Sequence, residues 1–190
     1  MAALGELLFY ITTEDQENDA ENSPTQPEDD GNNRWIVPGN VASLLDRVLR
    51  VNHGNSGSSA MTDEVVQHYA TKTLQNMFAQ GISAQVARFT THDFALHLRD
   101  AIRGGRNDAH RVTAITALAL LLRRNPKVLH KIVDKPTLNY ILGHFSDMRS
   151  RTLQPGLTIM NLVLYHGRHM SNNVKEVRNM LIASTGILAT

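Results

Sequence analysis

Apolar side chains along most of this chain recur at the three-to-four-residue spacing of a helix that buries one face. The run Val41–Val51, for example, has apolar residues at 41, 44, 45, 48 and 49, which lie together on a helical surface. No segment shows the period-two alternation that is typical of a half-buried strand. The pattern predicts helices over residues 1–13, 41–51, 63–80, 91–103, 107–124, 151–165 and 173–183.

Capping residues and prolines mark several ends of these predicted helices. Thr62 is placed to cap the helix that starts at Asp63, and Gly81 is placed to end it. Pro126 and Pro136 each stand where a helix can begin, because the first turn does not need the N–H group that proline lacks. These signals divide the chain into short helices joined by tight turns.

An internal repeat relates the predicted helices to one another. Residues 64–77 align with 109–122 at an offset of 45, and 109–122 align with 152–165 at an offset of 43. Residues 89–102 and 132–145 also align at an offset of 43. Such periods, with two or three helices in each unit, are typical of armadillo and HEAT repeats. We therefore expect an all-α fold, an armadillo/HEAT-type right-handed superhelical solenoid. A four-helix bundle, which needs no repeat, is the competing arrangement.

Equivalent positions in the three aligned segments predict what each repeat buries. The aligned sets are Ala70, Ile115 and Thr158; Leu74, Ala119 and Leu162; and Met77, Leu122 and Tyr165. The residues that we expect in the core are Leu74, Ile115, Ala119, Leu122 and Leu162.

The repeat also predicts how the chain is divided. We expect the last helix of a partial repeat at 1–13, an acidic disordered insertion at 14–33, repeats at 34–81, 82–124 and 125–167, and the start of a truncated repeat at 168–190. End repeats without neighbours leave apolar faces uncovered. Self-association is therefore expected through Leu4, Leu8, Ile182 and Ile187.

The composition of the chain bears on its expected location in the cell. The 190 residues include no cysteine, which excludes disulfides and thiolate metal sites. No apolar run reaches the roughly 20 residues that span a bilayer, and the N-terminus lacks the basic region of a signal peptide. We expect a soluble protein of the cytoplasm.

The formal charge of +1 is unevenly distributed along the chain. Residues 14–30 hold eight acids and no Lys or Arg, which leaves 19 basic and 10 acidic residues elsewhere, a net charge of +9. The acidic stretch either competes with an acidic partner for the basic remainder, or only keeps that remainder soluble.

Basic residues gather around two turns between predicted helices. If the repeats stack, the two groups would lie on one edge of the solenoid as a strip that docks an acidic partner. The alternative is solvated helix ends, where the helix dipole favours cations. Nucleic acid is a second possible partner, although the aromatic residues that stack on single strands are missing. The strip comprises Arg99, Arg103, Arg106 and Arg111 at the first turn, and Arg123, Arg124, Lys127, Lys131 and Lys135 at the second.

Motifs for catalysis or metal binding do not emerge. His166 and His169 are spaced to share a helical face, but no nearby acid completes the three or more ligands that a metal needs. There is no nucleophile elbow of the G-x-S-x-G type. We predict no catalytic residue, no metal and no cofactor.

Four stretches of the chain resemble a known family: AALGELLFYITT, RWIVPGNVASLLDRVL, DEVVQHYATKTLQN and RVTAITALALLLRRNPKVLHKIVDKPTLN. They are similar to the C-terminal armadillo/HEAT region of the Fused/Runkel group of kinase-like proteins, and within it most closely to the fourth Unc-51-like kinase, often regarded as a pseudokinase. DEVVQHYATKTLQN is the most specific, because its polar residues match as well. The resemblance covers most of 1–13 and 34–145 and is weaker beyond 146.

The resemblance implies a non-catalytic, protein-binding scaffold at microtubule structures, such as cilia, flagella or the division apparatus. The acidic tails of tubulin are one partner that it suggests. The kinase-like domain of the group lies N-terminal to the repeats, and its glycine-rich loop, HRD and DFG motifs do not occur here. Phosphoryl transfer is therefore not implied for this chain.

Overall fold

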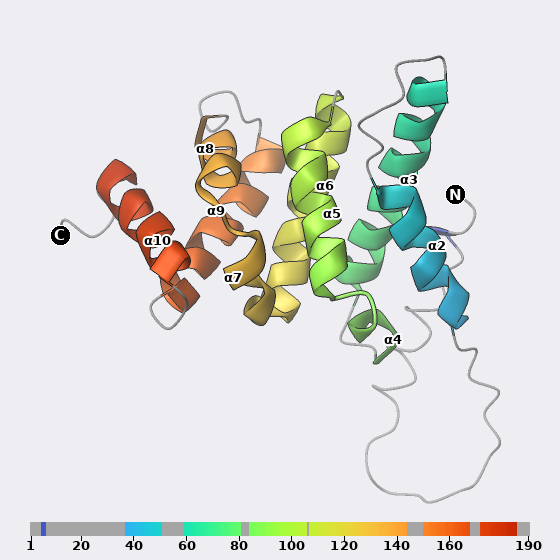
Figure 1. Cartoon of the computed structure of the whole chain (residues 1–190), viewed down its shortest axis with the longest axis horizontal. Coiled ribbons are helices and arrows are strands. Elements are labelled where there is room, and N and C mark those ends of the chain that lie inside the picture. The colour runs from blue at the N-terminus through green and yellow to red at the C-terminus, as the bar shows by residue number, and fades with distance from the viewer. Residues whose placement is uncertain are drawn as a thin grey trace, which may run out of the picture. The chain divides into compact units, whose positions relative to one another are not determined.

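The computed structural model describes residues 5–6, 37–50, 59–80, 84–105, 107–143, 150–167 and 172–185. Within these ranges every regular element is a helix (Figure 1), which confirms the all-α prediction. The chain forms two compact units, Met1–Phe89 and Thr90–Thr190. None of the described helices is long and apolar enough to cross a membrane.

The first unit is built on α2 (Gly39–Leu49), which packs against α3 (Ser59–Ala79). A short helix, α4 (Ala84–Ala87), follows, and Arg88 donates a hydrogen bond over 3.0 Å to the carbonyl of Val37. This bond ties the end of the unit to the segment before α2.

Helix α3 begins earlier than the sequence predicted. It starts at Ser59, so Thr62 lies inside the helix and is not its N-cap. Ala60 and Met61, before Thr62, favour helix, and α3 extends through them.

A close approach to α3 occurs at Gly5. A Cβ at this position would lie 2.6 Å from the Oγ1 of Thr73, a residue that is itself buried on α3. The Thr73 hydroxyl donates to the carbonyl of Tyr69 over 2.9 Å. Only glycine fits against α3 here without displacing the threonine.

The second unit opens with the antiparallel pair α5 (His92–Gly104) and α6 (Asp108–Arg124). Thr91 caps α5 by accepting from the N–H of Phe94, and Asn107 caps α6 by accepting from the N–H of Ala109 over 2.8 Å. The remaining elements are η1 (Pro126–Val128), α7 (Leu129–Ile132), α8 (Lys135–Gly143), α9 (Ser150–His166) and α10 (Asn172–Thr185).

The helices of the second unit form two layers (Figure 1). Helices α5, α7 and α8 lie in one layer, and α6 and α9 lie behind them, with α6 packed against both α5 and α9. Helix α10 contacts α9 and α7. Fully buried side chains fill the space between the layers, among them Leu98, Ile102, Leu118, Leu121, Leu122, Leu129, Ile141 and Val163.

The predicted core is confirmed at four positions and wrong at one. The four buried residues are Leu74, Ile115, Ala119 and Leu122, whereas Leu162 is only half-buried. Helix α9 instead buries Ile159, Met160 and Val163, which follow Ala114, Ile115 and Leu118 by 45 residues. The second offset is thus 45 and not 43. The alignment failed because α9 carries apolar residues on two faces.

Several predictions fall outside the described residues. These are the acidic stretch 14–33 and the side chains of Leu4, Leu8 and Ile187, while Ile182 is half-buried on α10. The repeat boundaries and the superhelical path stay predictions.

Candidate protein-docking surface

The structure separates the two groups of basic residues that the sequence placed on one strip. Arg111 lies in the first turn of α6 and Arg123 in the last. A helix of 17 residues is about 25 Å long at roughly 1.5 Å per residue. Consecutive turns of antiparallel helices alternate between the two ends, so these two turns do not share an edge. We call Arg99, Arg103 and Arg111 the first basic cluster; Arg106 lies outside the described residues.

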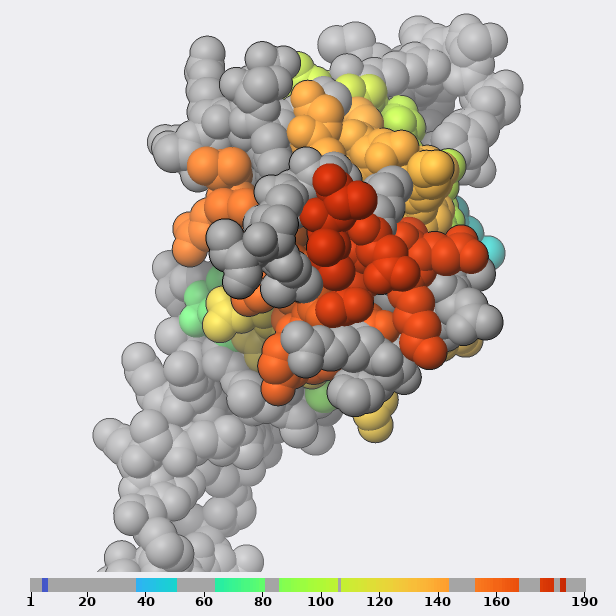
Figure 2. Space-filling view, turned by 90° about the vertical axis from the view of Figure 1, so that its left-hand side faces the viewer, coloured from blue at the N-terminus to red at the C-terminus, as the bar shows by residue number. Residues whose placement is uncertain are grey.

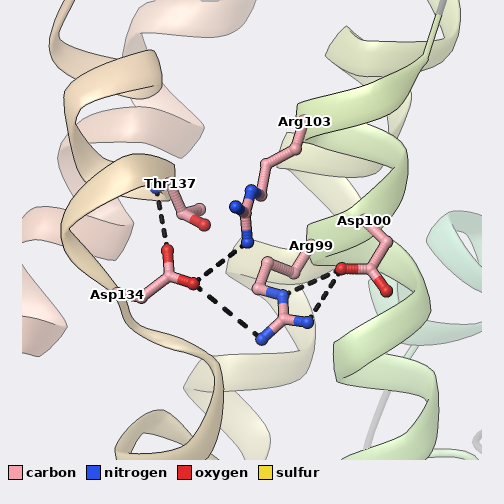
Figure 3. Close-up of polar contacts among 5 residues, drawn as sticks. All are labelled: Arg99, Asp100, Arg103, Asp134 and Thr137. Atoms are coloured by element: carbon pink, nitrogen blue, oxygen red, sulfur yellow. Dashed lines mark hydrogen bonds and ion pairs between the residues drawn. The ribbon is translucent and has the colours of Figure 1, made fainter.

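Two arginines of the first basic cluster are paired with carboxylates (Figure 3). Arg103 donates from Nη1 to Oδ2 of Asp134 over 3.1 Å, and Nη1 of Arg99 lies 4.0 Å from the same oxygen. Arg99 also donates from Nε and Nη2 to Oδ1 of Asp100, over 3.0 and 2.8 Å. Two positive charges therefore face two negative ones within the protein.

Asp134 has a second role, because it caps α8. Its Oδ1 accepts a hydrogen bond from the N–H of Thr137 over 2.9 Å (Figure 3), and a negative charge at a helix N-terminus is stabilising. The cap fixes the carboxylate that Arg99 and Arg103 reach. Together these contacts tie α5 to α8.

Arg111, the third residue of the first basic cluster, also makes contacts within the fold. Its Nε donates to the carbonyl of Gly105, and its Nη1 donates to the hydroxyl of Tyr140 over 2.9 Å. The guanidinium lies 5.3 Å from the centroid of the Tyr140 ring, within cation–π range, and 3.7 Å from Asp108. Arg111 thus joins the α5–α6 turn to α8.

Other exposed basic residues of the predicted strip differ from these in having no acid partner among the residues that the structure describes. We call Arg123, Lys127 and Lys131 the second basic cluster: they are exposed on α6, η1 and α7. Lys135 is also exposed, but it begins α8 next to Asp134, the partner of Arg103. Within the described part of the chain the side chains of the second basic cluster make neither an ion pair nor a hydrogen bond. Such an uncompensated surface attracts negative charge.

Arg124, the neighbour of this cluster, is half-buried. Loss of hydration on burial, and then the positive charge of Arg123, lower the pKa of Arg124 from its ordinary value. The like charges at the end of α6 therefore repel one another, which an acidic ligand would relieve.

Sequence reasoning missed an exposed apolar row on α9. Leu153, Leu157 and Tyr165 are 37%, 47% and 72% exposed, and Tyr165 had been aligned with core residues. An offset of 45 pairs Tyr165 with Leu120 and not with the buried Leu122. Leu120 is only half-buried, so the corrected alignment agrees with the exposure of Tyr165.

Metal binding finds no support in the described residues. They contain no group of three His, Asp or Glu side chains placed to hold an ion. His166 lies at the end of α9, and His169 lies outside the described residues.

Comparison with known proteins identifies relatives over most of the chain. It is 31% identical to the serine/threonine-protein kinase RUNKEL of Arabidopsis thaliana, over 93% of the chain and 13% of the relative. It is 27% identical to the serine/threonine-protein kinase ULK4 of Mus musculus, over 93% of the chain and 12% of the relative. No family model matches the chain. No solved structure matches it either.

These relatives bear out the resemblance seen in the sequence, without favouring ULK4 over RUNKEL. The chain spans about one eighth of the length of each of them. The kinase activity that their names state therefore does not carry over to this chain. It is a homologue of a segment of the kinase-like proteins RUNKEL and ULK4.

Proposed function

We propose that the chain is a non-catalytic scaffold segment that binds an acidic partner protein through the second basic cluster. The observation that carries this proposal is the contrast between the two clusters. Arg99, Arg103 and Arg111 are held by contacts within the fold, whereas the second basic cluster stands exposed without acids in the described part of the chain. Cations that form no ion pair among the described residues are available to a partner.

The proposed scaffold is an armadillo/HEAT solenoid. Supporting it, α6 and α9 pack side by side and bury residues 45 positions apart, as stacked repeats do. The relatives are named serine/threonine-protein kinases; in such a protein this segment would recruit other proteins beside the kinase-like domain. Microtubule structures in the cytoplasm or in cilia are the proposed setting, and the acidic tubulin tails are proposed partners.

A titration with a labelled poly-glutamate peptide tests the proposal. The variant Arg123→Gln/Lys127→Gln/Lys131→Gln should bind the peptide at least about tenfold more weakly than the wild type, equivalent to about 1.4 kcal/mol. The matched control is Arg47→Gln/Lys72→Gln/Lys175→Gln, which removes one Arg and two Lys that are also exposed. The control should bind like the wild type, although its net charge is the same as that of the test variant.

Equal losses in the two variants would show that only net charge matters, and would overturn the assignment to the second basic cluster. A single-stranded oligonucleotide serves as the competing ligand. If it binds more tightly than the peptide, with an affinity that falls steeply as salt rises, the chain is a nucleic-acid-binding repeat and not a protein scaffold.

A further inference from the structure

The exposed apolar row of α9 is uncharged along its whole length. Leu153, Leu157, Asn161 and Tyr165 follow one another at intervals of four residues, so they share one side of the helix. No acidic or basic residue occurs between Leu153 and Tyr165. Three large apolar side chains in one exposed row are more than the single apolar residues scattered over ordinary surfaces.

Helix α6 presents the equivalent face beside this row. Val112, Thr116 and Leu120 stand 45 residues before Leu157, Asn161 and Tyr165, and all three are half-buried, on a helix whose other sides are largely buried. The two helices pack together and run in the same direction (Figure 1). Their outward faces therefore form one surface, which is two helices wide.

Part of α9 stays uncovered although α10 packs on it. Figure 2 shows α10 in red over the middle of the view, with α9 in orange emerging at its left. The exposed fractions of Leu157 and Tyr165 agree with this view.

One end of this surface is positively charged. Arg123 follows Leu120 by three residues, at the end of the outward face of α6, and Lys127 and Lys131 lie on the elements that come next. The chain has no acidic residue at 109–133 or at 148–175. A ligand for this surface must therefore combine apolar side chains with negative charge at one end.

We infer that the outward face of α6 and α9 binds an amphipathic helix of a partner protein, with its apolar side against Leu153, Leu157 and Tyr165 and its acids at Arg123 and Lys127 of the second basic cluster. Helices bind in this way when apolar residues recur at three-to-four-residue intervals to match the anchors beneath them. This inference rests on the proposed function, because it adds an apolar half to the same docking surface.

Two labelled peptides of equal length and about 20 residues separate the apolar from the charged contribution. One is poly-glutamate, and the other places leucine at helical three-to-four-residue intervals in a glutamate background, titrated at concentrations where it is monomeric. The wild-type chain should bind the leucine peptide at least about tenfold more tightly. The variant Leu157→Ser/Tyr165→Ser should remove this advantage and leave poly-glutamate binding unchanged.

The first unit supplies a matched control. Val65 and Tyr69 are an exposed apolar pair on α3, so Val65→Ser/Tyr69→Ser makes a comparable change elsewhere and should keep the preference for the leucine peptide. Equal affinity of the wild type for both peptides would overturn the inference and leave the proposed function standing. Failure to bind either peptide would overturn the proposed function itself. A wild-type dimer that Leu157→Ser/Tyr165→Ser converts to monomer, measured by sedimentation, would show that a second copy occupies the face and would likewise overturn the inference.

Discussion

Arg103 on α5 donates a hydrogen bond over 3.1 Å to Asp134, the residue that caps α8. The two residues are 31 positions apart, and their contact joins α5, the first helix of the second unit, to α8. A cation that the sequence suggests for partner binding is thus used within the fold. The division between internal and available cations underlies the proposed function.

Replacing Asp134 separates its capping role from its charge. Asp134→Ala removes the acceptor for the Thr137 N–H and should lower the free energy of unfolding by about 1 kcal/mol, within a usual range of about 0.5–2 kcal/mol. Asp134→Asn keeps an acceptor and loses the ion pairs, which contribute little because Asp134 and Arg103 are 36% and 41% exposed. Urea denaturation should rank wild type above Asn and Asn above Ala. An Asn variant as unstable as Ala would contradict the assignment of Asp134 as a cap.

Two leucines of the first unit test the core directly. Leu74 on α3 is 0% exposed, whereas Leu44 on α2 is 41% exposed. Leu74→Ala should cost about 2–5 kcal/mol, since a buried cavity forms, and Leu44→Ala should cost well under half as much. Similar losses in chemical denaturation would mean that α3 does not bury the face described.

A third prediction concerns the close approach of Gly5 to Thr73. Gly5→Ala places a methyl group 2.6 Å from the Thr73 hydroxyl, and overpacking of this kind costs about 1–3 kcal/mol. Gly143, at the end of α8, has nothing within 4 Å of its added Cβ. Gly143→Ala should therefore leave the melting temperature almost unchanged. A Gly5→Ala protein with an unchanged melting temperature would exclude the close approach.

Acid should weaken the first unit through His68. Burial, and then the charge of Lys72, lower the pKa of His68 below its ordinary value of 6.5. The unfolded chain therefore binds a proton more readily than the folded one, and the free energy of unfolding falls as pH drops through about 6.5 toward the lower folded-state pKa. His68→Gln should reduce this slope in denaturation curves taken between pH 7 and 5. An identical slope in both proteins would show that other groups carry the acid sensitivity.

Much of the fold could be predicted because helical periodicity is local. Helices α5 and α6 begin within one residue of their predicted starts, and the caps at Thr91 and Asn107 explain why. The short helix α4 was not predicted, since four residues carry no periodic signal. The start of α3 was misplaced, because Thr62, a residue type that often caps a helix, lies inside α3.

The candidate site was harder to predict, because it depends on pairing and exposure. Arg99 and Arg123 look alike in the sequence, and only the fold brings Asp134 to one and leaves the other without an acid in the described residues. Tyr165 was aligned with Met77 and Leu122 through the offset of 43, yet it lies on the outer face of α9. Apolar identity alone cannot distinguish a core residue from an interface residue.

The location of the bound partner can be measured with a single fluorescent label. The chain has no cysteine, so Asn161→Cys, on the exposed row of α9, and Asn139→Cys, exposed on α8, each accept one bimane dye at matched positions. A tryptophan placed among the leucines of the glutamate–leucine peptide quenches bimane on contact. Quenching of the dye at position 161 that saturates with peptide, without quenching at 139, is the predicted result. Quenching at 139 alone, or equally at both positions, would contradict docking on the face of α6 and α9.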